Sequence, residues 1–414
     1  SSFTTTARCS GTSFIVTPSL GSVIPSGTTY SWNAPVSTAN ALTNGQSQGA
    51  PGTTTIYGLL YNTTNVQQTA TYTVTPAFGT CIGTPFAFSI PINPTPSVNN
   101  FTRVVCSGTL VNISPVQPGD GSIIPVGTTY TWSGISVTGI NGGFINGSTG
   151  NPTFFSTTLT LNASVNSART ATFTVTPASP ANLGGCAGTA FAITITVNPR
   201  AIINAMSDIA CSGAPFTISP TNNTNGTVPA GTTYTWTTPI MGASVTGGDS
   251  QTIPAPNING TLFVDGNSSQ TAVYTVTPIS LNCGVGNPFT LTIIVRPAVT
   301  INSFSLATCS GVPFAYTPTN GQYGNVIPNG TTFTWSEPTG TGFSGGLSNS
   351  TAADAIVGTL SATSNYIATA TYVVTPSITA CSQSGTFTVM VRVTPYPIVS
   401  PMSSTFCSGF FSDT

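Results

Sequence analysis

The chain has 414 residues, only 3% of them charged, with six basic residues, seven acidic residues and no histidine. All six basic residues are arginine, so solubility must come from Ser, Thr, Asn and Gln. This balance excludes a basic nucleic-acid-binding surface, and the absence of Lys and His removes the commonest general bases of enzymes. The formal net charge of −1 leaves little long-range repulsion, which makes self-association easier than for most proteins.

A long sequence pattern recurs along the chain. Its first block, Cys-Ser-Gly, begins at positions 9, 106, 211, 309 and 407, so the spacing is 97 to 105 residues. Such an interval is long enough for an independent hydrophobic core, unlike the short unit of a solenoid. We therefore expect four domains, with a truncated opening strand in the first, and a chain that is a piece of a longer protein. The expected domains are residues 1–94, 95–199, 200–297 and 298–397, and residues 398–414 begin a fifth.

Within each unit, Val, Ile, Thr, Tyr and Phe alternate with polar residues in a period of two. In the first unit this pattern predicts an opening strand before Cys9 and further strands at 13–18, 30–32, 55–61, 69–76 and 85–94. Alternation of this kind is typical of short antiparallel strands with one buried face, and their spacing is typical of a β-sandwich. The predicted fold is all-β, a tandem array of immunoglobulin-like β-sandwich domains.

Each unit contains one tryptophan, at the end of a Gly-Thr-Thr-Tyr/Phe-x-Trp block. A large aromatic side chain in an alternating strand is predicted to fill the core between the two sheets. After the proline that closes each unit, the next opening strand follows within a few residues. Proline fixes φ and stiffens such a joint, so we expect an extended, semi-rigid rod. The predicted core tryptophans are Trp32, Trp132, Trp236 and Trp335.

The segments between each tryptophan and the following Thr-x-Thr-rich strand differ most between units. Residues 33–68, 133–169 and 237–270 are rich in Gly, Asn and Ser, and they are predicted to be mostly loops around one or two strands, such as the strand at 55–61. Loops on a rigid scaffold commonly carry recognition. Any partner is therefore expected to bind there, with solvated loops that bind nothing as the alternative.

Nine cysteines, with no histidine and no Cys-x-x-Cys pair, argue against a zinc site and favour disulfides. Disulfides indicate an oxidising, extracytoplasmic location. Two pairing registers fit the spacing. In one, the second cysteine of a unit pairs with the first of the next, as in Cys81–Cys106, which leaves Cys9 alone. The favoured register instead pairs cysteines within units, as Cys9–Cys81, Cys106–Cys186, Cys211–Cys283 and Cys309–Cys381, and leaves Cys407 without a partner.

The length of the last strand favours pairing within units. That strand separates Cys81 from Cys106 and carries the chain roughly 26 Å away, whereas a disulfide needs Cα atoms within about 7 Å. In a plain immunoglobulin-like strand order, however, the second and last strands start at opposite ends of the sandwich. Pairing within units therefore requires an altered strand order.

The sequence offers little catalytic chemistry. Its acidic residues are scattered, and no pair of them occupies equivalent positions in all units, so neither a glycosidase pair nor a calcium cluster is indicated. We predict that the chain is not an enzyme and uses no metal or cofactor. No apolar run approaches the roughly 18 to 20 residues of a membrane helix.

The Cys-Ser-Gly, Gly-Thr-Thr-Tyr/Phe-x-Trp and Thr-Val-Thr-Pro blocks resemble the PKD-like and immunoglobulin-like repeats of very large Bacteroidota surface proteins, such as the gliding adhesins of the SprB type. The Trp-Asp-Phe-Gly-Asp-Gly segment of PKD domains is missing after each tryptophan. The resemblance implies export across the outer membrane of a Gram-negative bacterium by the type IX route, and gliding motility as a setting.

These observations predict a structural stalk or adhesin segment of an extracellular repeat protein. Its expected partners are neighbouring repeats of the same chain and either surface polysaccharide, other cell-surface proteins or further copies of itself, with no nucleic acid and no membrane span in this part of the protein. Two alternatives stay open. The chain could be a subunit of a self-assembling extracellular filament or sheath, which the near-neutral charge favours. It could also be a carbohydrate- or ice-binding module, which would need an exposed array of aromatic or Thr side chains.

Overall fold

The computed structural model describes residues 2–18, 22–37, 41–115, 121–133, 137–143, 149–150, 155–379, 381, 385–399 and 401. The expected start of a fifth repeat at 398–414, including Cys407, therefore lies almost entirely outside the described residues. The chain divides into two compact units. One comprises Ser1–Ala201, Gly226–Gly231 and Ser280–Gly284, and the other comprises Ile202–Asn225, Thr232–Ile279 and Val285–Thr414. The domain boundaries expected from the sequence remain predictions.

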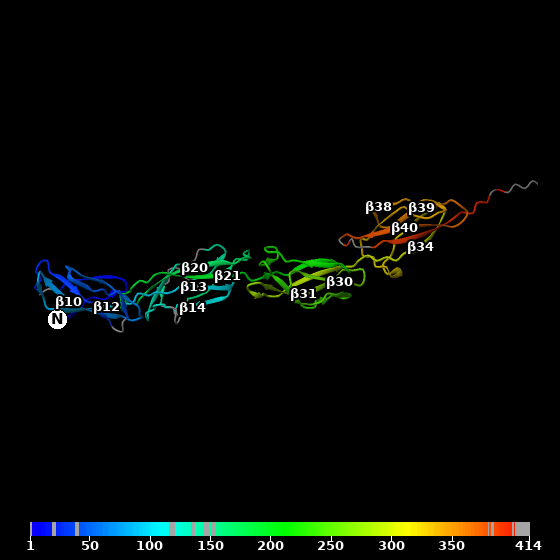
Figure 1. The fold of residues 1–414 in the computed structure, drawn as a ribbon. Coiled ribbons are helices and arrows are strands. Elements are labelled where there is room, and N and C mark those ends of the chain that lie inside the picture. Colours follow the sequence, from blue (N-terminus) through cyan, green and yellow to red (C-terminus); the bar gives the residue numbers. More distant parts are fainter. Residues whose placement is uncertain are drawn as a thin grey trace, which may run out of the picture. The chain divides into compact units, whose positions relative to one another are not determined.

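The fourth repeat shows the architecture most simply (Figure 1). A five-stranded sheet has the order β34-β41-β40-β36-β38, and a second sheet has the order β35-β39-β37. Alternate residues of its strands are buried and exposed, as the period of two predicts. The strands are β34 (Phe304–Cys309), β35 (Pro313–Tyr316), β36 (Thr332–Trp335), β37 (Phe343–Gly345), β38 (Asn349–Ala353), β39 (Ile356–Ala362), β40 (Ala368–Ser377) and β41 (Phe387–Thr394), with a 3-10 helix η3 (Gln322–Gly324).

The third repeat has the same two sheets, in the orders β23-β33-β31-β26-β29 and β24-β30-β28. Short strands β27 and β32 also pair with β31. The strands are β22 (Ile202–Ile203), β23 (Met206–Cys211), β24 (Pro215–Ile218), β25 (Gly226–Thr227), β26 (Thr233–Trp236), β27 (Ile240–Met241), β28 (Val245–Gly247), β29 (Gln251–Ala255), β30 (Ile258–Val264), β31 (Gln270–Ser280), β32 (Gly284–Val285) and β33 (Phe289–Arg296).

The first repeat keeps the main sheet order, β1-β12-β10-β4-β7, and its second layer contains the pairs β3-β8 and β6-β9. The strands are β1 (Ser2–Thr4), β2 (Arg8–Cys9), β3 (Ser13–Val16), β4 (Thr29–Trp32), β5 (Val36–Ser37), β6 (Leu42–Thr43), β7 (Gln48–Thr53), β8 (Ile56–Leu59), β9 (Tyr61–Asn62), β10 (Gln68–Phe78), β11 (Cys81–Ile82) and β12 (Phe86–Asn93).

The second repeat has the main sheet order β13-β21-β20-β15-β17 and the pairs β14-β18 and β16-β19. No α-helix occurs in the described part of the chain, so the predicted all-β tandem fold is confirmed. The elements are β13 (Phe101–Cys106), β14 (Leu110–Ile113), β15 (Thr129–Trp132), β16 (Ile140–Asn141), β17 (Thr149–Gly150), β18 (Phe155–Thr158), β19 (Thr160–Leu161), β20 (Arg169–Ala178), the 3-10 helix η2 (Ala181–Leu183) and β21 (Phe191–Asn198).

The first and last strands of each repeat run parallel to each other. This pairing positions the opening cysteine, which is the first residue of the Cys-Ser-Gly block. In the fourth repeat the register runs from Phe304 opposite Val389 to Cys309 opposite Thr394. In the other repeats the opening cysteine likewise lies opposite the last residue of the last strand: Cys9 opposite Asn93, Cys106 opposite Asn198, and Cys211 opposite Arg296.

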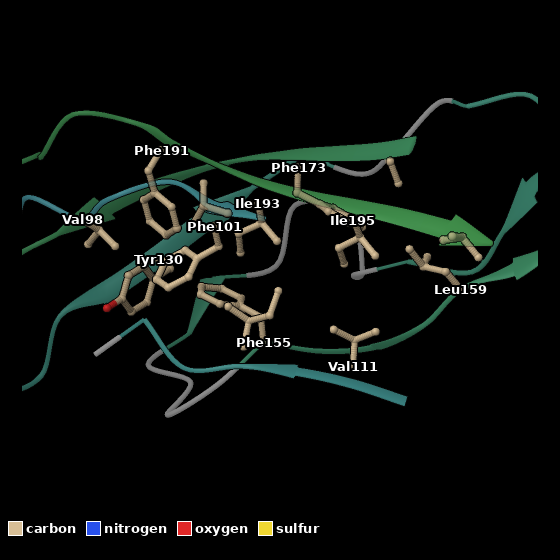
Figure 2. Close-up of a cluster of buried hydrophobic side chains, with 14 of the residues drawn as sticks. Val98, Phe101, Val111, Tyr130, Phe155, Leu159, Phe173, Phe191, Ile193 and Ile195 are labelled. Atoms are coloured by element: carbon tan, nitrogen blue, oxygen red, sulfur yellow. The ribbon is translucent and has the colours of Figure 1, made fainter. Parts of the chain in front are cut away.

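The core of each repeat lies between its two layers and is built from aromatic and branched side chains. In the second repeat, the rings of Phe101, Tyr130 and Phe191 gather beside Phe155 (Figure 2). The ring centroids of Tyr130 and Phe155 are 5.4 Å apart in an edge-to-face arrangement, which is favourable for aromatic pairs. In each of the other three repeats the long central strand contributes a tyrosine ring that is at most 1% exposed, namely Tyr72, Tyr274 and Tyr372.

The tryptophans pack within or against these cores. Trp32, Trp236 and Trp335 are each 6% exposed, whereas Trp132 is half-buried against its cluster. The indole N–H of Trp32 donates to the Gln46 carbonyl at 3.1 Å, and equivalent bonds run from Trp236 to Asp249 and from Trp335 to Leu347. A buried indole N–H needs an acceptor, so each of these three tryptophans also fixes the loop that follows it.

The Cys-Ser-Gly block forms the turn that carries the chain from the first layer of the sandwich to the second. In the first repeat the Thr12 N–H donates to the Cys9 carbonyl at 3.0 Å, and Gly11 adopts φ +79°. The Ser10 hydroxyl oxygen accepts the N–H of Asn62 at 2.8 Å. A glycine at the third position is what a type II turn requires, which explains why the block recurs.

Candidate functional site: the disulfide-bridged repeat junctions

Three disulfides cross-link consecutive repeats. Their Cα–Cα distances are 5.6, 5.7 and 5.7 Å, within the usual range for a disulfide. In each, the opening cysteine of one repeat bonds to the second cysteine of the next. The expected pairing within units is therefore wrong, and so is the alternative Cys81–Cys106 register. The observed bonds are Cys9–Cys186, Cys106–Cys283 and Cys211–Cys381.

The strand order explains why pairing within a repeat fails. Cys309 lies opposite Thr394, at the end of β41, whereas Cys381 precedes Phe387, where β41 begins. Eight strand residues, at about 3.3 Å each, therefore place the two cysteines of one repeat at opposite ends of its sheet. This is the plain immunoglobulin-like arrangement, and no altered strand order rescues the expected pairing. The opening cysteine instead meets the hairpin of the following repeat.

Two of the predicted disulfide cysteines have no disulfide partner. Cys81 and Cys309 are free and exposed. Each occupies the place of a bridging cysteine, since Cys81 lies in the β10–β11 hairpin, where Phe78 pairs with Cys81, and Cys309 ends β34. The expected disulfides of Cys81 in the first repeat and Cys309 in the fourth are therefore wrong within the described chain.

Non-covalent contacts accompany the bridges. In the first compact unit, the side-chain oxygen Oδ1 of Asn65 accepts the N–H of Ile124 at 2.8 Å, and the Thr227 hydroxyl donates to the Ala163 carbonyl at 2.6 Å. Both bonds join the loop before the long central strand of one repeat to the next repeat. In the second unit a cavity of about 280 Å³ lies at the corresponding junction. It is lined by Asn267, Ser269, Arg296 and Pro297 from one repeat and by Pro328, Asn329, Gly330, Ile378, Thr379 and Cys381 from the next.

The overlapping disulfides create a short covalent path along the array. From Cys9 a bond leads to Cys186; the chain then runs 25 positions to Cys211, and a second bond leads to Cys381. Fully extended, this path measures about 100 Å, because an extended residue spans at most about 3.5 Å. The polypeptide between Cys9 and Cys381 would reach about 1,300 Å without the bonds. The bonds therefore limit how far the array can be stretched.

A separate pocket lies among the loops of the first repeat, where recognition was predicted. Its volume is about 320 Å³, and its lining includes Asn44, Gln46, Gln48, Trp32 and Tyr57. The two aromatic rings meet edge-to-face at 5.7 Å. Trp32 is buried, so little of its ring is available for stacking on a ligand. Loop recognition therefore remains a prediction.

The described residues contain no group of three or more Cys, Asp or Glu side chains that could hold a metal ion. Among these same residues, no helix is long and apolar enough to cross a membrane.

A series of two-layer β-sandwiches, each with its first strand parallel to its last, defines an immunoglobulin-like repeat protein. The sequence model of the PKD-like domain matches residues 6–96, 103–201, 207–299 and 306–397. The chain therefore belongs to the PKD-like domain family. Proteins built of such tandem domains are typically extracellular adhesion or structural repeat proteins, and the fold family is generally non-enzymatic. The disulfides agree with an extracellular location.

Several solved structures are similar to this chain. The human desmocollin-1 ectodomain is 12% identical, with 95% of this chain and 80% of that chain covered and a TM-score of 0.26. The three N-terminal domains of the bacteriophage RB49 outer capsid protein Hoc are 14% identical, with 70% and 96% covered and a TM-score of 0.28. The insect immune protein hemolin is 9% identical, with 95% and 97% covered and a TM-score of 0.23. No curated protein sequence matches the chain.

The cross-repeat pairing was missed although its signal is in the sequence. The opening cysteine follows the first strand, and the second cysteine precedes the last strand. If those two strands are parallel neighbours, the cysteines must lie at opposite ends of one repeat. The second cysteine then faces the preceding repeat, whose own opening cysteine is the partner within reach.

Proposed function

We propose that the chain is a load-bearing stalk segment of an extracellular bacterial adhesin. The proposed setting is the surface of a Gram-negative bacterium, reached by type IX export, with gliding motility as the process served. The resemblance of the repeated blocks to gliding adhesins supports this setting. Binding to surface polysaccharide or to other surface proteins is assigned to loops or to other modules of the protein.

The covalent path through the overlapping disulfides carries the proposal. In a chain of unlinked β-sandwiches, a pulling force is resisted by hydrogen bonds, and each sandwich that yields releases its whole length. Here the force between Cys9 and Cys381 passes through two disulfides and the 25 positions from Cys186 to Cys211. Most of the residues of the second and third repeats lie off this path, so they remain unloaded once the path is taut.

Single-molecule pulling on the two termini tests this role. The shortest oxidised path between the termini has about 66 residue steps and two bonds, which extend to about 240 Å. The reduced chain extends to about 1,400 Å. We expect the oxidised protein to stop near the shorter length at forces that unfold the reduced repeats.

Two variants sharpen this measurement. Cys211→Ser removes one bond of the path and lengthens the maximum extension about threefold, because the force must then detour through the Cys106–Cys283 bond. Cys309→Ser changes a free cysteine and should leave the extension unaltered. An oxidised protein that extends as far as the reduced one would remove the physical basis of the stalk assignment.

A further inference from the structure

The cavity at the junction of the third and fourth repeats is polar and carries a positive charge. Its volume is about 280 Å³, close to the lower limit of about 300 Å³ for small-molecule sites. Arg296 is the one charged residue among the described residues that line it. Amide and hydroxyl side chains come from both repeats, as Asn267 and Ser269 of the third and Asn329 and Thr379 of the fourth.

The arginine stands where the first two repeats have a buried asparagine. Arg296 lies opposite the opening cysteine of its repeat, as Asn93 and Asn198 do in theirs. Asn93 is 4% exposed, and Gly184 of the second repeat lies so close that a Cβ there would come within 2.9 Å of the Asn93 amide nitrogen. This position therefore faces the following repeat. In the third repeat it places a guanidinium at the junction in place of a neutral amide.

A glutamine side chain fills the corresponding space at the junction of the first and second repeats. There, Gln67 Nε2 donates to Asn93 Oδ1 at 2.6 Å. The counterpart of Gln67 in the third repeat is Ser269, since each directly precedes the long central strand, β10 or β31. The serine side chain is much shorter than that of glutamine. The space between the repeats is therefore left open beside Arg296.

A second contact of that first junction is also redirected. Asn65 Oδ1 accepts the Ile124 N–H at 2.8 Å, which joins the first repeat to the second. In the fourth repeat the N–H of Ile327, the counterpart of Ile124, donates instead to Asn320 of its own repeat at 2.9 Å. Asn267, the counterpart of Asn65, is exposed and lines the cavity. Its amide can therefore reach a ligand bound there.

The charge of the cavity defines the class of ligand. None of the described lining residues is acidic, and Asp265, in the same loop as Asn267, is not one of them. A guanidinium pairs with a carboxylate, or with a tetrahedral oxyanion such as sulfate, through two parallel N–H···O bonds. Amides and hydroxyls both donate and accept hydrogen bonds, so they suit the hydroxyl groups of a sugar. One anionic group among several hydroxyls is the chemistry of an acidic saccharide.

We propose that the junction of the third and fourth repeats binds an acidic saccharide. Arg296 holds its carboxylate or sulfate group, and Asn267 and Asn329 hydrogen-bond to its hydroxyls. The inference names a site and a ligand class for the polysaccharide binding proposed above, and in that respect it rests on the proposed function. Because the two amides belong to different repeats, the ligand needs the assembled junction, which the Cys211–Cys381 bond holds together.

Calorimetric titration of the full chain tests the site with oligosaccharides of equal length. The probes are a galacturonic acid oligomer, a sulfated galactose oligomer and an unmodified galactose oligomer. We expect an anionic probe to bind and the neutral one to bind about tenfold more weakly or not at all, because the charge-assisted bonds are the strong ones. The anionic probe that binds more tightly identifies the group as carboxylate or sulfate. Added NaCl should weaken the binding, because salt screens exposed charges.

Variants of the lining residues locate the binding. Arg296→Gln should weaken the binding of the anionic probe about tenfold or more, and Arg296→Lys should be intermediate, because lysine keeps the charge and loses the planar fork. Asn329→Val installs the residue that the second repeat has there, Val126, and should weaken binding about threefold through the loss of a hydrogen bond. Arg392→Gln, at an exposed position of β41, is the matched control and should bind as the wild type does.

Several results would overturn the proposal. They are a wild type that binds neither anionic probe, equal affinity for the neutral probe, or full binding by Arg296→Gln. Denaturant midpoints of the variants separate loss of a contact from loss of the junction, and Asn329→Val, at an exposed position, tests the site if Arg296→Gln is unstable. The extension of the oxidised chain is measured separately. A chain that binds the acidic probe but extends like the reduced protein would refute only the stalk role, and the reverse would refute only this site.

Discussion

Cys211 and Cys381 are 170 residues apart in the sequence, and their Cα atoms lie 5.7 Å apart in a disulfide that joins the third and fourth repeats. Cys211 ends β23, and Cys381 lies in the connection between β40 and β41. The bond therefore ties the far end of one sandwich to the near end of the next. The sequence suggested independent domains joined only by the polypeptide chain. The structure instead contains domains that are cross-linked by disulfides.

Breaking this bond should destabilise its junction. Closing a loop of 170 residues stabilises the folded state by about 5 kcal/mol in the chain-entropy model, so we expect Cys211→Ser to lose up to that amount. Denaturant unfolding under non-reducing conditions measures the loss. The matched control is Cys309→Ser, which alters a free thiol. Equal stability of the two variants, or a wild type indifferent to reduction, would contradict the expectation.

A side chain added to the glycine of the Cys-Ser-Gly turn should lower the stability of the repeat. Gly311 has φ +78°, and an added Cβ there meets nothing within 4 Å, so Gly311→Ala tests the backbone alone. We expect a loss of about 1 to 2 kcal/mol in the free energy of unfolding, because non-glycine residues are strained in this region. Gly385→Ala, also with open space but without a positive φ, is the control and should change stability little.

The hydroxyl of Tyr72 is a buried polar group without a hydrogen-bond partner among the described residues. Tyr72→Phe removes that unsatisfied group and keeps the ring, so the variant should be as stable as the wild type or more stable by about 1 kcal/mol. Thermal or denaturant unfolding provides the measurement. Tyr57→Phe, at a half-exposed position, is the control. A clear loss of stability in Tyr72→Phe would show that the hydroxyl has a partner.

The buried tyrosines also predict alkaline unfolding. Burial raises the pKa of Tyr72, Tyr130 and Tyr234 to about 12 from the ordinary value of 10. Between pH 10 and 12 the unfolded chain loses protons that the folded chain keeps, so stability falls as pH rises through this window. Below pH 10 both states hold these protons, and stability should not vary on their account. Denaturant midpoints from pH 8 to 12 test this, and Tyr72→Phe should reduce the slope.

The repeats and the strands were predictable from the sequence because they depend on local patterns. The strand predicted at 85–94 is β12, Phe86–Asn93, and the one at 69–76 lies within β10, Gln68–Phe78. Alternation of apolar residues fixes which face of each strand is buried, and turn glycines fix where strands end. The burial of Trp32 and Trp335 follows from the same local rule.

The cysteine pairing was decided by the tertiary structure alone. A sulfur bonds to whichever cysteine is brought within a few ångströms, and distance along the chain does not enter. In this protein the proximity depends on a parallel pairing of first and last strands, which sends Cys9 to one end of its repeat and Cys81 to the other. Composition and spacing could establish that disulfides form, but the partner of each cysteine follows from which end of a sheet it occupies.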